Sequence, residues 1–184
     1  HAIIHDAIQI LVRLTHRGAS SSDNRTGDGA GLCIQVPHEF CQAIAQEQDF
    51  ELPPEGDYAT GLFFLPINPE ERQFCQQLLE RLCAEHGQPF LAWRKLPVNR
   101  GALGEIAARS EPSIWQLFIA RNAETAAGRD FERILYLIRK RTENAIRNSG
   151  LIEKDSCYIP TLSSRTIIYK GLLQPQDFTD YFQD

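Results

Sequence analysis

Several features that would mark particular classes of protein are missing from this 184-residue sequence. It has no methionine, and its 19 Lys and Arg are outnumbered by 24 Asp and Glu, which gives a formal net charge of −5. No stretch approaches the ~18 consecutive apolar residues of a transmembrane helix. The sequence therefore predicts neither a strongly basic nucleic-acid-binding protein nor a membrane protein. Gly and Pro, at 12 and 10 residues, are too few for a low-complexity chain, and a hydrophobic content of 42% suits one globular domain.

The two ends of the chain are also unusual. Position 1 is not methionine, and the chain opens with His1-Ala2-Ile3-Ile4, which already has a helical pattern and lacks the features of a signal peptide. The other end carries two aromatic residues, Tyr181 and Phe182, close to the last residue. We therefore expect the 184 residues to be an excerpt from a larger protein.

Cysteine usage argues against a secreted disulfide framework. The five cysteines, at positions 33, 41, 75, 83 and 157, are odd in number and widely spaced. This pattern lacks the CxxC of a zinc ribbon and is not typical of a disulfide framework. Metal binding by His38 with Cys41, or by Cys75 with Cys83, is one interpretation. Free, buried cysteines in a reducing cytosol are the favoured one, because free cysteine commonly packs as a small hydrophobic residue.

The pattern of apolar residues predicts a layered fold of mixed helices and strands. Helices are predicted over 2–15, 37–48, 69–86 and 130–148, and a short one near 174–177. Asn68-Pro69-Glu70-Glu71 is typical of a helix start rather than of an acid–base pair. Strands are predicted over 31–36, 58–65, 89–94, 114–120, 157–162 and 166–170, the last two joined by a turn at Ser163-Ser164-Arg165. Residues 97–113 form a loop with room for a helical turn. Several short connections indicate an α/β or α+β fold without a domain boundary.

The segment richest in chemical groups lies between the first helix and the first strand. It reads Thr15-His16-Arg17-Gly18-Ala19, followed by a Gly-rich stretch from Asp23 to Gly31. The stretch lacks the GxxxxGK[ST] pattern of a phosphate loop, and Ile34 stands where a calcium loop starting at Asp23 would need Glu. Two interpretations remain open on physical grounds: a tight structural loop, or a loop that places a functional arginine. The basic cluster Arg139-Lys140-Arg141 is interpreted as a solvated helix face.

Residues 6–37 carry sequence blocks that are specific enough to be compared with a known protein family. DAIQILVRLTHRGASSSDNRTGDGAGLCIQVP resembles the start of the glutamine amidotransferase domain of the glutamate synthase large chain, a class II, amino-terminal-nucleophile domain. Four further blocks resemble the same family in the same order: HEF at 38–40, LPPEGDYATGLFFLP at 52–66, ILYLIRKRTENAIR at 134–147 and SCYIPTLSSRTIIYKGLL at 156–173. The resemblance covers nearly the whole chain.

The resemblance implies a fold and a reaction. The fold is an α+β four-layer α-β-β-α sandwich of the amino-terminal-nucleophile hydrolase type. The reaction is glutamine hydrolysis by an amino-terminal cysteine, whose thiolate attacks the amide carbon while its own α-amino group acts as general base. The released ammonia reaches 2-oxoglutarate at a distant FMN site, where the resulting imine is reduced to a second glutamate. The implied partners are glutamine, the remaining domains of the parent chain, and ferredoxin or an NADPH-oxidising subunit as electron donor.

The sequence departs from the family pattern in ways that make the domain incomplete. The nucleophilic cysteine is expected upstream of His1, and none of the five cysteines matches it. The Asn-Gly oxyanion motif and the arginine for the glutamine carboxylate are expected downstream of the SSRTIIYKG block, beyond Asp184. Residues 1–184 are thus predicted to be part of a single amidotransferase domain, without its nucleophile strand and its C-terminal portion, and to be inactive alone. No cofactor is expected in this segment; FMN and an iron–sulfur cluster are implied for the parent protein.

The resemblance implies that the HRG motif, His16-Arg17-Gly18, is the part of the family's active site that lies within residues 1–184. It places Arg17 beside the missing nucleophile, with Gly18 allowing close approach and His16 supporting the turn. The alternative is that Arg17 only fixes the loop through hydrogen bonds to backbone carbonyls. Two other functions stay open: a stand-alone class II amidotransferase-like protein with another acceptor, and a degenerate, non-catalytic interaction module. The THRGA-to-TGDGAG and LSSRTIIYKG blocks are slightly more similar to those of ferredoxin-dependent enzymes than to those of the NADPH type. The expected location is the cytoplasm, or the plastid stroma for a plant or algal protein.

Overall fold

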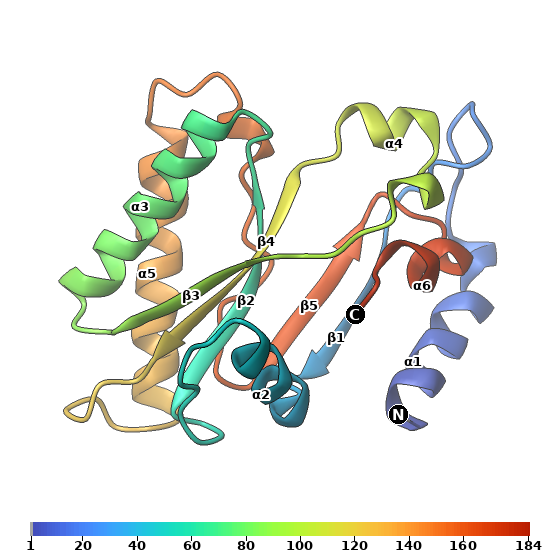
Figure 1. Cartoon of the computed structure of the whole chain (residues 1–184). Helices are drawn as coiled ribbons and strands as arrows, with labels where there is room; N and C mark the ends of the chain where they lie inside the picture. Colours follow the sequence, from blue (N-terminus) through green and yellow to red (C-terminus); the bar gives the residue numbers. More distant parts are fainter. Residues whose placement is uncertain (1) are drawn as a thin grey trace. The chain divides into compact units, whose positions relative to one another are not determined.

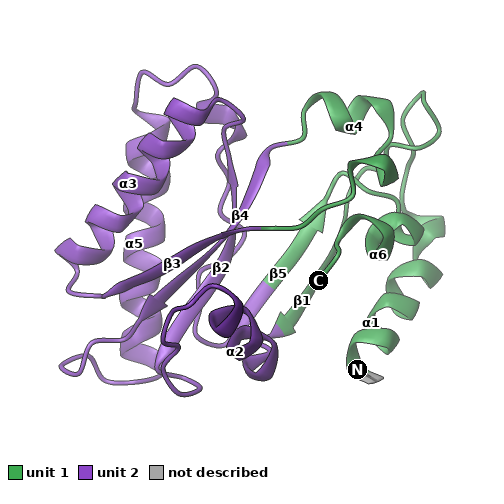
Figure 2. Cartoon of the chain, in the orientation of Figure 1, with its two compact units in different colours: residues 1–34, 96–111, 168–184 green, residues 35–95, 112–167 purple. Residues whose placement is uncertain are grey.

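The structure, a computed structural model, describes residues 2–184, so His1 lies outside the described residues (Figure 1). The chain forms two compact units (Figure 2). Unit 1 contains residues 1–34, 96–111 and 168–184, and unit 2 contains residues 35–95 and 112–167. Helices and strands are mixed along the sequence, and the strands form one two-stranded and one three-stranded sheet. This arrangement confirms the α+β class.

Unit 2 is built on a three-stranded antiparallel sheet. Its strands are β2 (Tyr58–Leu65), β4 (Ser113–Ala120) and β3 (Phe90–Lys95), with β4 in the centre. β2 and β4 pair over their full lengths, from Tyr58 opposite Ala120 to Leu65 opposite Ser113, whereas a bulge interrupts the β3 pairing between Phe90 and Ala92. All three strands were predicted, because each is a short run of aromatic and aliphatic residues.

Two long helices cover one face of this sheet. α3 (Pro69–Glu85) and α5 (Arg129–Arg147) bury a shared core against Ala59, Phe63 and Leu65 of β2 and against Leu117 and Ile119 of β4. α3 begins as the sequence predicts: the Asn68 side chain accepts hydrogen bonds from the backbone N–H groups of Glu70 (2.9 Å) and Glu71 (3.1 Å).

A shorter helix covers the other face. α2 (His38–Glu47) packs Cys41 and Ile44 against Tyr58 of β2 and Phe118 of β4. These strand residues alternate with those that face α3 and α5, as successive side chains of a strand must. Unit 2 therefore has three layers, with helices on both sides of the sheet.

The strand predicted over 157–162 is wrong. In place of a ladder, the described residues form isolated bridges with β2, Tyr158 with Phe64 inside this segment and Ser163 with Thr60 just after it. Pro160 stands between the two bridges and has no N–H to continue a ladder. The segment approaches β2 closely: a Cβ atom on Gly61 would lie 2.1 Å from the Thr161 carbonyl oxygen. Residues 163–165 are consequently not the turn of a strand hairpin.

Unit 1 contains the candidate loop. Its main elements are α1 (Ala2–Arg13), α4 (Glu105–Arg109), α6 (Phe178–Tyr181), and most of the two-stranded sheet of β1 (Ala30–Gln35) and β5 (Thr166–Gly171), whose arrows run in opposite directions in Figure 1. The loop predicted over 97–113 contains α4 and a 3₁₀ turn at Arg100–Ala102. It is tied to α6 because Tyr181 donates to the buried carboxylate of Glu111 (2.8 Å), which also pairs with Arg100.

All five cysteines are free thiols. Cys41, Cys75 and Cys83 are buried and Cys157 is half-buried, but Cys33 is exposed on β1, so the expectation of buried cysteines is wrong at that position.

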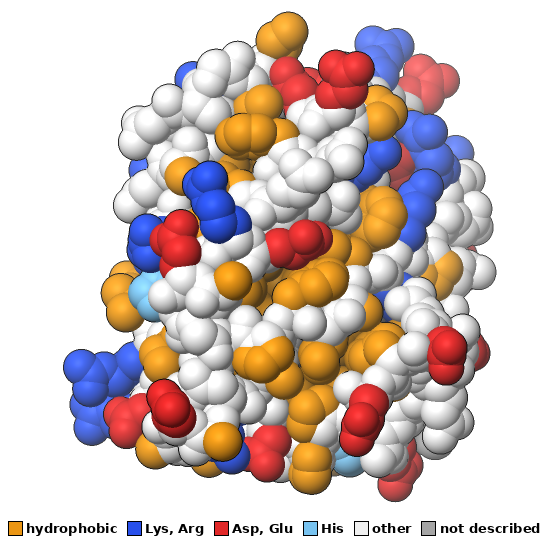
Figure 3. Space-filling view, turned by 60° about the vertical axis from the view of Figure 1, so that its left-hand side comes forward, with side chains coloured by type: hydrophobic (Ala, Val, Ile, Leu, Met, Phe, Trp, Pro, Cys, Tyr) orange, Lys and Arg blue, Asp and Glu red, His pale blue; other side chains and the backbone are white. Residues whose placement is uncertain are grey.

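Among residues 2–184 no helix is long and apolar enough to cross a bilayer. Figure 3 shows one face of the molecule, where cationic and anionic side chains interleave and hydrophobic side chains gather in a band between them.

Candidate active-site loop

The HRG motif forms a single 3₁₀ turn directly after α1. The turn covers Thr15–Arg17, and its backbone is closed by hydrogen bonds from Arg17 N–H to Leu14 O (2.9 Å) and from Gly18 N–H to Thr15 O (3.1 Å). Side chains tie the turn back to the helix: the Thr15 hydroxyl donates to Val12 O (2.6 Å). The turn thereby satisfies carbonyls that the helix end leaves without partners.

His16 and Arg17 differ in what they contact. The Nδ1 atom of His16 lies 3.0 Å from the Arg13 carbonyl oxygen, so the tautomer protonated there donates to the last turn of α1. The Arg17 guanidinium is exposed and makes no hydrogen bond or ion pair to another residue of the described chain, 2–184. The structure thus shows none of the bonds to backbone carbonyls that would make Arg17 a loop anchor. A guanidinium with five free donors is suited to a carboxylate or an amide oxygen.

Gly18 lies against the second half of the loop. A Cβ atom at Gly18 would come within 3.1 Å of Asp28 Oδ1, a contact tighter than most side chains tolerate. Residues 19–28 fold back as a small hairpin, with Ser21 N–H donating to Thr26 O (2.8 Å) and Asp28 N–H donating to Ala19 O (3.0 Å). A side chain at position 18 would therefore press against this hairpin, and the close approach of Gly18 to a nucleophile stays a prediction.

Asp23 and Thr26 organise the hairpin. Asp23 Oδ1 accepts from the backbone N–H groups of Arg25 (3.0 Å) and Thr26 (2.8 Å), while Oδ2 accepts from the Thr26 hydroxyl (2.6 Å). These hydrogen bonds hold the pKa of the Asp23 carboxyl well below its usual range, and the bond from the Thr26 side chain contributes most. Asp23 is therefore ionised at neutral pH and serves as the acceptor that closes the turn.

The same two residues join the hairpin to α4. Asp23 Oδ2 accepts from Ile106 N–H (3.1 Å), and the Thr26 hydroxyl oxygen accepts from Ala107 N–H (3.1 Å). Both N–H groups lie in the first turn of α4, where backbone donors have no partner within the helix. The hairpin thus caps a helix more than 80 residues away in sequence. This link was not predicted from the sequence, although Asp and Thr three residues apart are a common local capping pattern.

The residues of the loop do not form a metal site. No group of three or more His, Cys, Asp or Glu side chains within residues 2–184 is arranged to hold a metal ion. The chemical capacity of the segment is therefore an exposed guanidinium on a 3₁₀ turn that hydrogen bonds tie to the end of α1.

Comparison with known proteins identifies the family. A family model described as glutamine amidotransferases class II matches residues 1–184. The whole chain is 37% identical to the glutamate synthase (NADPH) large chain of Bacillus subtilis strain 168, 36% identical to glutamate synthase (NADH) of Saccharomyces cerevisiae, and 32% identical to ferredoxin-dependent glutamate synthase 1 of Arabidopsis thaliana.

The chain belongs to the class II glutamine amidotransferases, because the family model spans its full length. The matched relatives are much longer: the chain covers 12%, 9% and 11% of the bacterial, yeast and plant proteins. It therefore corresponds to about a tenth of the length of these glutamate synthases.

Proposed function

We propose that this chain is part of the glutaminase domain of a glutamate synthase, which releases ammonia from glutamine for the reductive synthesis of glutamate from 2-oxoglutarate. The observation that carries the proposal is that relatives from a bacterium, a yeast and a plant, all glutamate synthases, align with the chain over its entire length. The α+β architecture supports it further. In this proposal the two sheets belong to the four-layer α-β-β-α sandwich of amino-terminal-nucleophile hydrolases.

In the proposed reaction Arg17 lies beside the nucleophile. An amino-terminal cysteine, supplied from outside residues 1–184, attacks the amide carbon of glutamine, and its own α-amino group takes up the thiol proton. The free Arg17 guanidinium stabilises negative charge near that cysteine, and His16 holds the turn that presents it. The exposure of the guanidinium, its lack of partners among the described residues and the hydrogen-bonded turn support this role.

The electron donor and cofactors belong to other segments in this proposal. FMN and an iron–sulfur cluster are implied for a parent glutamate synthase, and no step in residues 1–184 depends on them. The relatives include NADPH-, NADH- and ferredoxin-dependent enzymes at 32–37% identity. We expect either ferredoxin or an NADPH-oxidising subunit as donor, and a location in the cytoplasm or the plastid stroma.

The full-length protein tests this proposal directly. We expect glutamine-dependent formation of two glutamates when 2-oxoglutarate and either reduced ferredoxin or NADPH are supplied, measured by chromatography of the products. Glutamate release from glutamine without any use of 2-oxoglutarate would instead assign a class II amidotransferase with another acceptor. No glutamine hydrolysis under any condition would assign the degenerate interaction module.

Substitution of Arg17 tests the site. Arg17→Ala in the full-length protein should lower kcat/KM for glutamine about 10²-fold, the usual effect of losing one charge-stabilising donor. Arg17→Lys should recover part of this loss, because it keeps the charge without the planar fork. Arg13→Ala is the matched control, since Arg13 is likewise exposed and lies one turn earlier. Equal kinetics for the Arg17 and Arg13 variants would remove Arg17 from the site.

A further inference from the structure

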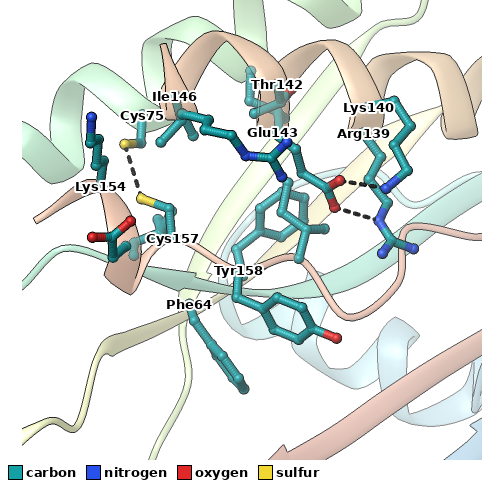
Figure 4. Close-up of a pocket in the computed structure, with 16 residues that line it drawn as sticks. Phe64, Cys75, Arg139, Lys140, Thr142, Glu143, Ile146, Lys154, Cys157 and Tyr158 are labelled. Carbon is teal, nitrogen blue, oxygen red and sulfur yellow. Dashed lines mark hydrogen bonds and ion pairs between the residues drawn. The ribbon is translucent and has the colours of Figure 1, made fainter. Parts of the chain in front are cut away.

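Unit 2 contains a cavity between its two long helices and the segment around residue 157 (Figure 4). Its volume is about 380 Å³. Apolar side chains from β2, α3 and α5 line it, among them Phe63, Leu79 and Ile146. Two thiols also line it: Cys75 from α3 and Cys157 from the segment that follows α5. The glutamine chemistry proposed above uses neither of them.

The two thiols are in contact. Their Sγ atoms lie 3.5 Å apart and share a hydrogen bond, drawn as a dashed line in Figure 4. A disulfide has an S–S distance of about 2.05 Å, so its formation requires the sulfurs to move roughly 1.5 Å closer. Rotation of the two side chains is the natural route, because the sulfurs already face each other. Residues 82 positions apart in sequence are thus arranged for a cross-link.

The pair is electrostatically asymmetric. The hydrogen bond from Cys157 lowers the pKa of Cys75, and the same hydrogen bond together with burial raises the pKa of Cys157. The carboxylate of Glu71 opposes ionisation of both thiols. The hydrogen bond therefore favours the arrangement in which Cys75 carries the negative charge and Cys157 keeps the proton. A thiolate held beside a thiol is the arrangement that thiol–disulfide exchange needs.

The cavity wall carries more positive than negative side chains. Four cations and two carboxylates line it: Arg139, Lys140, Arg147 and Lys154, with Glu143 and Asp155. Glu143 engages Arg139 (2.9 Å) and Lys140 (2.6 Å). Arg147 and Lys154 form no ion pair with any other described residue, so their charges are available to a ligand. Lys154 lines the same cavity as the two thiols (Figure 4). The wall is therefore suited to a small molecule that carries carboxylates.

We propose that Cys75 and Cys157 are a reversible modification site, which closes to a disulfide by exchange with an anionic, low-molecular-weight disulfide of the glutathione type, one half of which enters this cavity. The Cys75 thiolate attacks one sulfur of the entering disulfide, whose S–S bond breaks and releases a first thiolate. Cys157 then loses its proton to solvent and attacks Cys75 Sγ, which releases the second thiolate. Two protein thiols are oxidised and the entering disulfide is reduced to two thiols once each thiolate takes up one proton, so no other oxidant is needed.

The cross-link would join α3 to the segment that meets β2. Tyr158, the neighbour of Cys157, exchanges two backbone hydrogen bonds with Phe64 (2.9 and 3.0 Å). The disulfide would therefore fasten this segment to both the helix and the strand. A cross-link that closes a long loop reduces the freedom of the unfolded chain, and we expect the melting temperature to rise by roughly 5–15 °C.

Peptide mapping of the intact full-length protein tests the proposal. The protein is equilibrated with glutathione buffers of increasing disulfide content, quenched in acid, alkylated and digested with trypsin. Cleavage after Arg72, Arg81, Lys154 and Arg165 gives peptides 73–81 and 155–165, each with one cysteine. We expect these two peptides to become linked, with a loss of two hydrogens, and dithiothreitol to separate them. The result that overturns the proposal is full alkylation of both cysteines in native protein at every buffer composition.

Cys83 provides the internal control. It lies two turns further along α3, and its burial raises the pKa of the thiol to about 12. Its peptide, 82–94, should stay unlinked in native protein. Cys157→Ser should abolish both the linked peptide and the melting-temperature rise, and Cys83→Ser should preserve both. If either variant fails to fold, the wild-type peptide map and its melting temperature decide the question alone.

The charge of the oxidant tests the cavity wall. Glutathione disulfide is anionic at neutral pH, and cystamine is a cationic disulfide. We expect glutathione disulfide to oxidise the pair at least about tenfold faster than cystamine at low ionic strength, and Lys154→Gln to reduce that ratio. Equal rates for the two disulfides, unaffected by salt, would overturn the assignment of an anionic partner.

Discussion

At the scale of single residues, one carboxylate oxygen holds the segment that precedes β5. Glu132 Oε1 accepts from the Ser163 hydroxyl (3.0 Å), the Ser164 hydroxyl (2.7 Å) and the Ser164 N–H (2.7 Å). The Ser163 oxygen in turn accepts from Arg165 N–H (3.0 Å). The two serines are therefore structural, and the sequence-based prediction of a plain hairpin turn there missed their acceptor on α5.

Truncation of Glu132 should destabilise the fold. Glu132→Ala leaves three donors without their acceptor, and we expect it to lower the free energy of unfolding by about 2–3 kcal/mol. Glu132→Gln keeps one acceptor oxygen and should cost about 1 kcal/mol. Urea denaturation followed by circular dichroism measures both values. Equal losses for the two substitutions would mean that the negative charge, rather than one acceptor oxygen or the packing, explains the role of this side chain.

A second residue-scale prediction concerns Gly61. Because a Cβ atom there would meet the Thr161 carbonyl oxygen at 2.1 Å, Gly61→Ala must displace the segment from β2. We expect a loss of about 3 kcal/mol, at the upper end of overpacking effects. Gly150→Ala is the control, since a Cβ atom there meets nothing within 4 Å. The melting temperatures of the two variants should differ clearly; a wild-type value for Gly61→Ala would contradict the close approach.

At the scale of elements, α5 shows how a basic cluster becomes part of the packing. Arg139 and Lys140 share Glu143 within α5, and Arg141 pairs with Glu85 of α3 at 2.8 Å. The interpretation of these residues as a solvated face fits Arg141, half of whose side chain is exposed, but is wrong for Arg139, whose side chain is only 24% exposed. The sequence contained Glu143 at the right spacing, but depth below the surface depends on tertiary packing.

The ion pairs of Glu143 with Arg139 and Lys140 predict that the free energy of unfolding depends on pH. Burial raises the pKa of Glu143, but hydrogen bonds from Lys140 and Arg139 outweigh it and leave the pKa of Glu143 below its ordinary value of 4.5. As the pH falls, Glu143 therefore takes up a proton in the unfolded chain before it does so in the folded chain. The stabilisation by this carboxylate is complete above about pH 5 and is lost as the pH falls through the lowered pKa. Glu143→Gln should cost about 0.5–1 kcal/mol at pH 7 and less at pH 4.

Urea denaturation of the Glu143→Gln variant at the two pH values checks this sign. Glu124→Gln, a substitution at an exposed loop residue, is the control and should change little at either pH. A destabilisation that grows on acidification would contradict the direction of the pKa shift.

The elements themselves could largely be predicted from the sequence. α3 was found with its Asn68 cap, and β2, β3 and β4 with nearly their full bounds, because local patterns determine them. The strand prediction for 157–162 was wrong because tertiary contacts, rather than local patterns, determine the structure of that segment. Its composition favours a strand, but Pro160 interrupts the ladder, and what holds the segment is its contact with β2 and α5. Likewise, the HRG turn was recognisable from its residues, whereas the link from Asp23 to α4 depends on a contact 83 residues away.

At the scale of the whole molecule, residues 1–184 should not hydrolyse glutamine on their own. The proposed mechanism needs a nucleophile whose α-amino group is the base, and we expect none of the five cysteines, at positions 33, 41, 75, 83 and 157, to fill that role. We expect no glutamate release from glutamine by this chain, measured beside the full-length protein. Turnover that disappears when one of these five cysteines is replaced would identify a different nucleophile and overturn the proposed mechanism.

The cap that the hairpin supplies to α4 has a consequence for solvent exchange. The amide hydrogens of Ile106 and Ala107 are bound by Asp23 and Thr26 rather than by their own helix. Their deuterium uptake therefore reports whether the distant hairpin is closed, because the two amides lose their acceptors each time it opens. Two backbone positions far from Arg17 in sequence thus act as a built-in reporter of order in the loop that follows it.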